Sequence, residues 1–171
     1  MLTAFYITSA VAIIATVMVV VGRHAVHALL YLVVSLFAVA VLFYLLGAPF
    51  AAALEVIIYA GAIMVLFVFV IMMLKLGPET VAQERAWLAP RTWLGPAVLS
   101  AVLLAQWVWL LGQESSATIA ASEIGRTIPA REVGVSLFSQ YLLLVEIAGL
   151  MLLAALVGAF HIGRRREGRG S

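Results

Sequence analysis

Two acidic residues, Glu55 and Glu146, interrupt long apolar stretches of this sequence. A carboxylate inside a membrane span costs roughly 2.5 to 3.5 kcal/mol, so it normally faces protein or water and marks an ion or proton path. Both residues are therefore proton-path candidates. Glu55 lies near the end of its stretch, where an interfacial acid helped by the helix N-terminus is an alternative interpretation. For Glu146 the alternative is a protonated carboxyl that hydrogen-bonds a neighbouring helix.

A weakly packed turn follows Glu55. Tyr59 comes four residues later, on the same helix face, and is followed by Ala60-Gly61-Ala62. Glycine in a helix interior costs about 1 kcal/mol relative to alanine, so a break in the winding is inexpensive here. A bulky block from Val65 to Ile71 comes next. The pattern allows a glycine-centred bulge, although a glycine that serves only close packing is the simpler interpretation.

The chain offers few ligands for a cofactor. It has no cysteine, which excludes disulfides, iron–sulfur clusters and thiolate metal sites within it. His24, His27 and His161 are the three histidines. His24 and His27 are three residues apart on one helix and cannot flank a haem, so interfacial hydrogen bonding is the favoured role. We therefore expect no catalytic residue, no metal site and no cofactor in this chain.

The composition predicts the elements that position these residues. Of 171 residues, 65% are hydrophobic and 11% are charged, which indicates a lipid environment. A bilayer core about 30 Å thick needs roughly 20 apolar residues per helix, and backbone groups in lipid must be paired within helices. We therefore predict an all-α integral membrane protein, a single membrane domain of five transmembrane helices. The predicted spans are residues 2–22, 25–46, 51–74, 92–112 and 137–161.

Basic residues predict the orientation. Of the ten Lys and Arg residues, Arg126 and Arg131 fall on the side of the N-terminus, and the other eight fall opposite. The positive-inside rule then places the N-terminus outside, in the periplasm, and the C-terminus in the cytoplasm. Four of the arginines lie in a basic tail, residues 162–171, which we interpret as a membrane-surface anchor and not as a nucleic-acid site. The segment 113–136 is predicted to be a loop.

Small residues at four-residue spacing predict close helix contacts. One such stripe lies in the first span and another in the fourth: Ala4, Thr8, Ala12 and Thr16; Ala97, Ala101 and Ala105. The spacing predicts that each helix packs closely on a neighbour, without saying which.

The segment from Ala53 to Val70, ALEVIIYAGAIMVLFVFV, resembles subunit J of bacterial respiratory complex I, the proton-pumping NADH-quinone oxidoreductase. The likeness continues at His27-Ala-Leu-Leu-Tyr-Leu, at Gly95-Pro96 and from Val145-Glu146 to Ala159-Phe160-His161. It extends from Phe5 to Arg164 but does not include residues 113–130.

This resemblance implies a core subunit of the membrane arm in the bacterial cytoplasmic (inner) membrane. It implies contact with other membrane subunits of the complex, especially A, K, H and N. FMN, iron–sulfur clusters and quinone would be bound elsewhere in the complex, so this subunit would have no redox chemistry of its own.

The resemblance also implies a π-bulge in the third helix whose conversion to α-helix opens or closes a water path. Gly61 would be the pivot, and Glu55 and Glu146 would take lesser parts. The implied bulge or gate residues are Tyr59, Ala60, Gly61, Ala62, Met64, Val65 and Phe67.

Three other interpretations remain. The chain could be a stand-alone small ion transporter, but it has few intramembrane polar groups and no inverted repeat. It could be a passive scaffold, in which case Glu55, Tyr59 and Glu146 would all be replaceable. It could also be the equivalent subunit of a membrane hydrogenase or of a multi-subunit cation antiporter.

Overall fold

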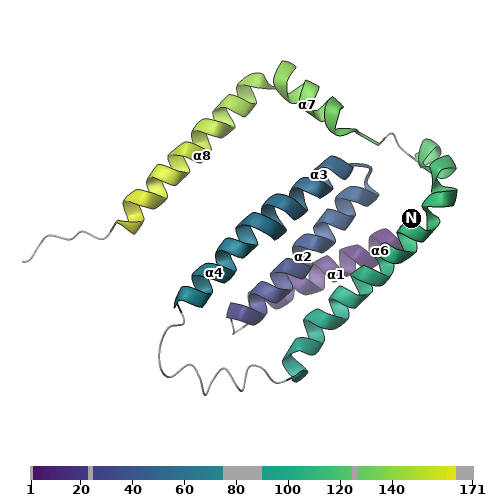
Figure 1. Cartoon of the computed structure of the whole chain (residues 1–171), viewed down its shortest axis with the longest axis horizontal. Helices are drawn as coiled ribbons and strands as arrows, with labels where there is room; N and C mark the ends of the chain where they lie inside the picture. The colour runs from purple at the N-terminus through teal and green to yellow at the C-terminus, as the bar shows by residue number, and fades with distance from the viewer. Residues whose placement is uncertain (1, 23–24, 75–89, 125–126, 165–171) are drawn as a thin grey trace, which may run out of the picture. The chain divides into compact units, whose positions relative to one another are not determined.

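The computed structural model describes residues 2–22, 25–74, 90–124 and 127–164, and every regular element in these segments is a helix (Figure 1). Several residues that set the predicted orientation lie outside this part of the chain. They are Arg23, Lys75, Arg85, Arg126, Arg165, Arg166 and Arg169. His24 and most of the basic tail lie outside it as well. The chain divides into two compact units, residues 1–128 and 129–171, which we describe separately.

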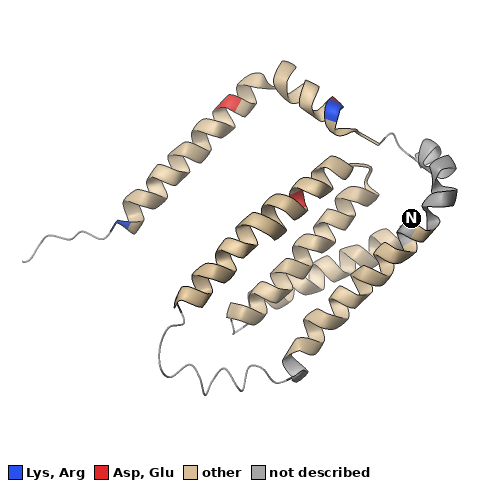
Figure 2. Cartoon of the chain, in the orientation of Figure 1, with Lys and Arg blue, Asp and Glu red and all other residues tan. Residues whose placement is uncertain are grey.

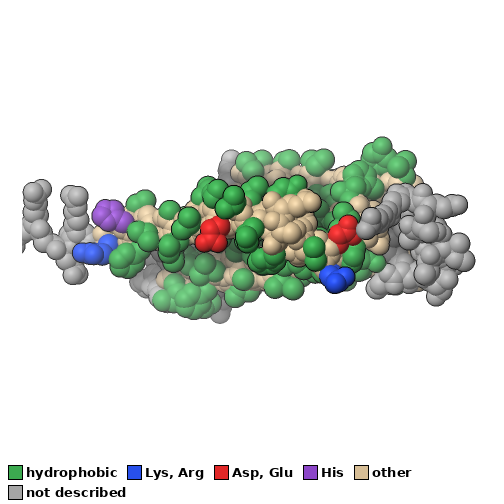
Figure 3. Space-filling view, turned by 90° about the horizontal axis from the view of Figure 1, so that it is seen from above, with side chains coloured by type: hydrophobic (Ala, Val, Ile, Leu, Met, Phe, Trp, Pro, Cys, Tyr) green, Lys and Arg blue, Asp and Glu red, His purple; other side chains and the backbone are tan. Residues whose placement is uncertain are grey.

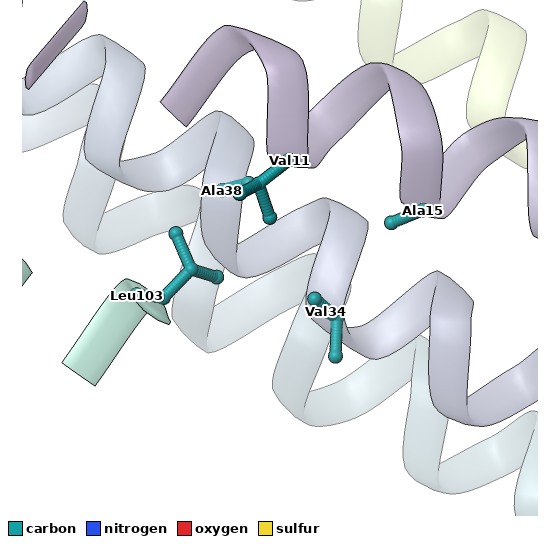
Figure 4. Close-up of a cluster of buried hydrophobic side chains, with 5 residues drawn as sticks. All are labelled: Val11, Ala15, Val34, Ala38 and Leu103. Atoms are coloured by element: carbon teal, nitrogen blue, oxygen red, sulfur yellow. The ribbon is translucent and has the colours of Figure 1, made fainter. Parts of the chain in front are cut away.

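The core of the first unit lies where α1 (Leu2–Val21), α2 (Ala25–Leu45) and α6 (Pro90–Ile124) meet. Figure 4 shows the buried cluster, whose members are Val11, Ala15, Val34, Ala38 and Leu103. Two of the five are alanines, which let the α1 and α2 backbones approach closely. The small-residue face predicted for α1 is confirmed at Ala4 and Thr8, since both side chains are buried.

The small-residue stripe predicted for the fourth span makes no buried contact within this chain. Ala97, Ala101 and Ala105 are all exposed on α6. The buried face of α6 carries Leu103 and Gln106 instead. The physical reason is that a buried amide must find hydrogen-bond partners, whereas alanine tolerates any neighbour.

The helix α6 also extends further than the sequence predicts. It continues to Ile124, so the loop expected over residues 113–136 is wrong where α6 occupies it. The continuation is rich in alanine and contains glutamate and glutamine, which favour helix formation. Pro96 lies inside the helix, where it removes one backbone N–H donor.

A Schellman motif turns the chain between α2 and α3 (Pro49–Leu54). Gly47 has a φ of 80°, a left-handed conformation that glycine adopts without a steric penalty. The Ala48 N–H donates to the Phe43 carbonyl and the Gly47 N–H to the Tyr44 carbonyl, both at 3.0 Å. Pro49 then starts α3 at a position where no backbone N–H is needed. The short turn therefore forces the two helices to pack antiparallel.

The third predicted span is one continuous rod of three segments: α3, the π-helix η1 (Glu55–Ile63) and α4 (Met64–Leu74). All three segments contact α2, which lies between this rod and the α1 and α6 helices (Figure 1). The rod therefore packs along its length against α2.

The second unit contains α7 (Ala130–Ser139) and α8 (Leu142–Gly163). The fifth predicted span began at residue 137, but the structure separates the two helices at Gln140 and Tyr141. There the Tyr141 N–H donates to the Ser136 carbonyl at 3.2 Å, five residues back. Pro129 in extended conformation precedes α7 and prevents the helix from starting earlier.

Four helical stretches are long and apolar enough to cross a membrane: Leu2–Val21, Ala25–Leu45, Pro49–Met73 and Leu142–Gly163. A shorter apolar stretch, Trp93–Trp109, lies in α6. Charged side chains are sparse along these helices (Figure 2), and apolar side chains cover much of the face that Figure 3 shows. The prediction of an all-helical membrane protein is therefore confirmed at this level.

Candidate functional site

The backbone of η1 departs from α-helical hydrogen bonding inside an otherwise apolar rod. At its C-terminal end the Met64 N–H donates to the carbonyl of Tyr59, five residues back, and to that of Gly61. At its start the Glu55 N–H donates to the carbonyls of Ala51 and Ala52, so the preceding segment is α-helical. The extra residue in the winding is thus confined between two regular helices, and π-helical segments of this kind are frequent at functional sites.

Gly61 lies within this π-helical winding, close to the backbone of the preceding turn. A Cβ atom added at Gly61 would lie 3.2 Å from the carbonyl oxygen of Val56, five residues back. That separation is shorter than most contacts of a Cβ atom. A side chain at residue 61 would therefore crowd the Val56 carbonyl, which the π winding brings close. Glycine therefore suits residue 61 while the segment is π-helical.

The structure places the predicted gate residues on both sides of the π-to-α boundary. Tyr59, Ala60, Gly61 and Ala62 lie in η1, and Met64, Val65 and Phe67 begin α4. Met64 is one of the most buried side chains of the described part, with 2% exposure. Tyr59, Val65 and Phe67 are exposed. Met64 alone among the larger gate side chains is therefore packed inside this unit.

The two acidic candidates lie in separate units of the chain. Glu55 is half-buried in the first turn of η1. Glu146 is exposed on α8. Among the described residues, no hydrogen bond joins Glu55 to Tyr59, four residues further along the helix. Glu55 therefore stands in the π-helix without a partner from its own helix face.

Sequence reasoning missed a polar cluster on the α1–α6 contact. Gln106 is 8% exposed, and its Nε2 donates to the Ala4 carbonyl at 2.7 Å and to Thr8 Oγ1 at 2.6 Å. A second link joins α1 to α2, where Thr16 Oγ1 and Ser35 Oγ are 2.8 Å apart. The available signal was a lone amide within an apolar stretch, which has to be paired when it is buried.

The histidines do not form a ligand set in the part of the chain that the structure describes. His27 is buried on α2, and His161 is exposed in the last turn of α8. No group of three or more His, Asp or Glu side chains there could hold a metal ion. The site defined by the structure is thus a backbone irregularity in a membrane helix and not a set of reactive groups.

The fold and this site define a class of protein: an all-helical, multi-helix membrane protein with a π-helical segment inside one membrane-length helix. The family model of NADH-ubiquinone/plastoquinone oxidoreductase chain 6 matches residues 15–162. The chain is 53% identical over 163 residues to NADH-quinone oxidoreductase subunit J of Pseudomonas aeruginosa, covering 95% of this chain and 96% of the relative.

Two further relatives carry the same name. The chain is 52% identical over 165 residues to NADH-quinone oxidoreductase subunit J of Escherichia coli K12, covering 96% of this chain and 87% of that protein. The identity is 47% over 163 residues for the subunit J of Buchnera aphidicola from Schizaphis graminum, covering 95% and 98%. The chain therefore belongs to the NADH-quinone oxidoreductase subunit J family, which confirms the resemblance.

Proposed function

We propose that this chain is a membrane-arm subunit of a proton-translocating NADH:quinone oxidoreductase in a bacterial cytoplasmic membrane. NADH oxidation through FMN and iron–sulfur clusters, and the reduction of quinone, belong to other subunits. Its own contribution is to gate a proton or water path through the α3–η1–α4 rod. The observation that carries the gate is the π-helical segment Glu55–Ile63, with its hydrogen bond from the Met64 N–H to the Tyr59 carbonyl.

A change of winding in η1 would alter which side chain packs against the rest of the unit. Converting a π-helix to an α-helix shifts the hydrogen-bond ladder by one residue, which rotates one side of the helix by on the order of 100°. Met64, now buried, would then give up its place to Ile63, which would stack over Tyr59 in the α form and is now 37% exposed. A discrete exchange of this kind is a two-state switch, because packed interfaces do not deform continuously.

The gate is tested by structures of the whole complex at rest and during turnover with NADH and quinone. We expect two states of the rod. One has the Met64 N–H bonded to the Tyr59 carbonyl, and the other has it bonded to the Ala60 carbonyl in an α-helix. The helix α2, on which the rod rests, should keep the same winding in both. A rod that remains π-helical with Met64 buried in every state of turnover contradicts the gate.

Glu55 and Glu146 are the proposed proton-path residues of this subunit. Glu55 stands at the start of the π-helix, so a change of winding beside it alters its surroundings. Glu146 is exposed on a membrane-length helix, a position that is costly unless a partner subunit or water faces it. Both are lesser participants, because neither is needed for the change of winding itself.

Five membrane spans with an external N-terminus complete the proposal. The apolar stretch Trp93–Trp109 is about 25 Å long at 1.5 Å per residue, near the lower end for a span. Its direction is supported by the Ile128 N–H, which donates to the Gly47 carbonyl at 3.1 Å. This bond ties the chain after α6 to the turn between α2 and α3. The helix α6 therefore has to run from the side where α4 ends to the side where α3 begins.

Labelling of single cysteines checks the span count, since the native chain contains no cysteine. We expect a membrane-impermeant maleimide to label Thr3→Cys in intact cells and Ser171→Cys only after the membrane is opened. Five spans put the two ends on opposite sides. Labelling of both variants from the same side would show an even number of spans, and permeabilised cells serve as the control for reactivity.

The alternatives differ from this proposal in what accompanies the chain. A mildly solubilised, tagged chain should co-purify with flavin- and iron–sulfur-containing proteins and with membrane subunits such as A, K, H and N. A stand-alone transporter would purify alone and move ions after reconstitution. Hydrogenase or antiporter partners in the purified material would support the equivalent subunit of those complexes.

A further inference from the structure

The polar cluster between α1 and α6 has hydrogen-bond acceptors left over and no donor. Gln106 Nε2 uses its two N–H groups on the Ala4 carbonyl and on Thr8 Oγ1. The Thr8 hydroxyl donates its proton to the Ala4 carbonyl at 2.8 Å. All three donors of the cluster are therefore committed.

The orientation of the Gln106 amide follows from its partners. The Ala4 carbonyl can only accept, so the atom facing it at 2.7 Å has to be the amide nitrogen. This fixes Oε1 on the other side of the amide, where it is buried and meets no protein donor among the described residues. Exchanging the nitrogen and oxygen would place two acceptors against each other, so the amide cannot relieve Oε1 by flipping.

The cluster can still accept hydrogen bonds, but it has no N–H or O–H group left to donate. The Ala4 carbonyl accepts from the Thr8 hydroxyl and from Gln106 Nε2 in addition to its place in the backbone ladder of α1, so it has no lone pair left. Oε1 keeps both of its lone pairs, and Thr8 Oγ1 keeps one. Thr8 is fully buried and Gln106 is 8% exposed, so neither bulk solvent nor an outside side chain reaches them readily. A species that satisfies the cluster has to be small, enclosed and able to donate.

We propose that Gln106 Oε1 is an internal hydration site that holds one water molecule at the α1–α6 contact. Water is the smallest double donor, and buried waters typically bond otherwise unsatisfied polar groups in this way. One of its O–H groups donates to Gln106 Oε1, and the other is available to the free lone pair of Thr8. The site lies on the contact between α1 and α6, so it does not depend on the winding of η1.

The test is a map of the whole complex at a resolution that shows ordered water, for the native chain, Thr8→Val and Gln106→Met. We expect a water peak at hydrogen-bond distance, about 2.8 Å, from Oε1 in the native complex. The peak should persist in Thr8→Val, which keeps Oε1 and the Ala4 carbonyl. It should be lost in Gln106→Met, which has a similar length and no acceptor oxygen.

Each departure from this pattern overturns the proposal. An Oε1 that meets only apolar atoms in the native map shows that no water binds. A protein donor bonded to Oε1, from this chain or a neighbouring subunit, replaces the water as the partner. A peak that survives in Gln106→Met is held by other groups. Should Gln106→Met fail to assemble, the native and Thr8→Val maps still decide, because both retain the proposed site.

Discussion

Replacing Gly61 with leucine should leave the complex assembled while lowering the quinone reductase rate and proton pumping together, by several-fold. Glycine disfavours regular helix by about 1 kcal/mol relative to alanine, so a larger residue stabilises the α form by a similar amount. A side chain at this position also presses on the Val56 carbonyl, a contact that belongs to the π form. Together these effects shift the winding equilibrium by at least about fivefold toward the α-helix. If turnover needs both the π form and the α form of the helix, quinone reduction and proton pumping both become slower.

The alanine variant separates this mechanism from a general effect of added bulk. Gly61→Ala should give a loss close to that of Gly61→Leu, because both gain similar helix propensity and both carry the Cβ that approaches the Val56 carbonyl. Gly149→Leu serves as the control, since Gly149 lies in the regular helix α8 and a Cβ added there meets nothing within 4 Å. The measurements are NADH:quinone reductase activity and proton uptake in the same vesicles. Full activity and pumping in an assembled Gly61→Leu complex would falsify the gate.

The third span shows how far sequence reasoning reaches. The residues around Gly61 predict a weak point in the helix, but they favour a packing glycine over a bulge. The structure has a π-helix that begins six residues earlier, at Glu55. Propensity measures how readily a residue leaves α geometry, and it does not encode which carbonyl its N–H will then select. The extra residue is shared over nine positions, so no single residue marks where the winding changes.

The helix α6 shows a different case, in which the regular pattern does not mark the face that is buried within this chain. Ala97, Ala101 and Ala105 have the spacing of a contact stripe, yet the buried side chains are Leu103 and Gln106. Small residues permit close approach, whereas a buried amide requires it, because an unpaired polar group in an apolar region is costly. The need to pair the Gln106 amide therefore decides which face of α6 is buried, and the alanines do not. One polar residue within an apolar span therefore predicts the inward face better than a stripe of alanines.

The contact between α2 and α6 leads to the second large expected effect, from Gly95→Leu. A Cβ atom at Gly95 would collide with the Tyr31 hydroxyl and lie 3.1 Å from the ring carbon that bears it. Overpacking of this kind typically costs about 1 to 3 kcal/mol, and the end of the partly buried Tyr31 ring has to move aside for the new side chain. We expect a fall in the midpoint temperature of the solubilised complex and less of this chain in purified complexes.

Second-site and control variants identify the collision as the cause. Tyr31→Ala removes the ring that occupies the space, so the double variant should be less destabilised than the sum of the two single variants, as expected for residues in contact. Gly112→Leu places the same side chain on the same helix, where a Cβ meets nothing within 4 Å, and should change stability by no more than about 0.5 kcal/mol. Equal losses in Gly95→Leu and Gly112→Leu, or strict additivity with Tyr31→Ala, would mean that the close approach of α6 to Tyr31 does not hold these helices together.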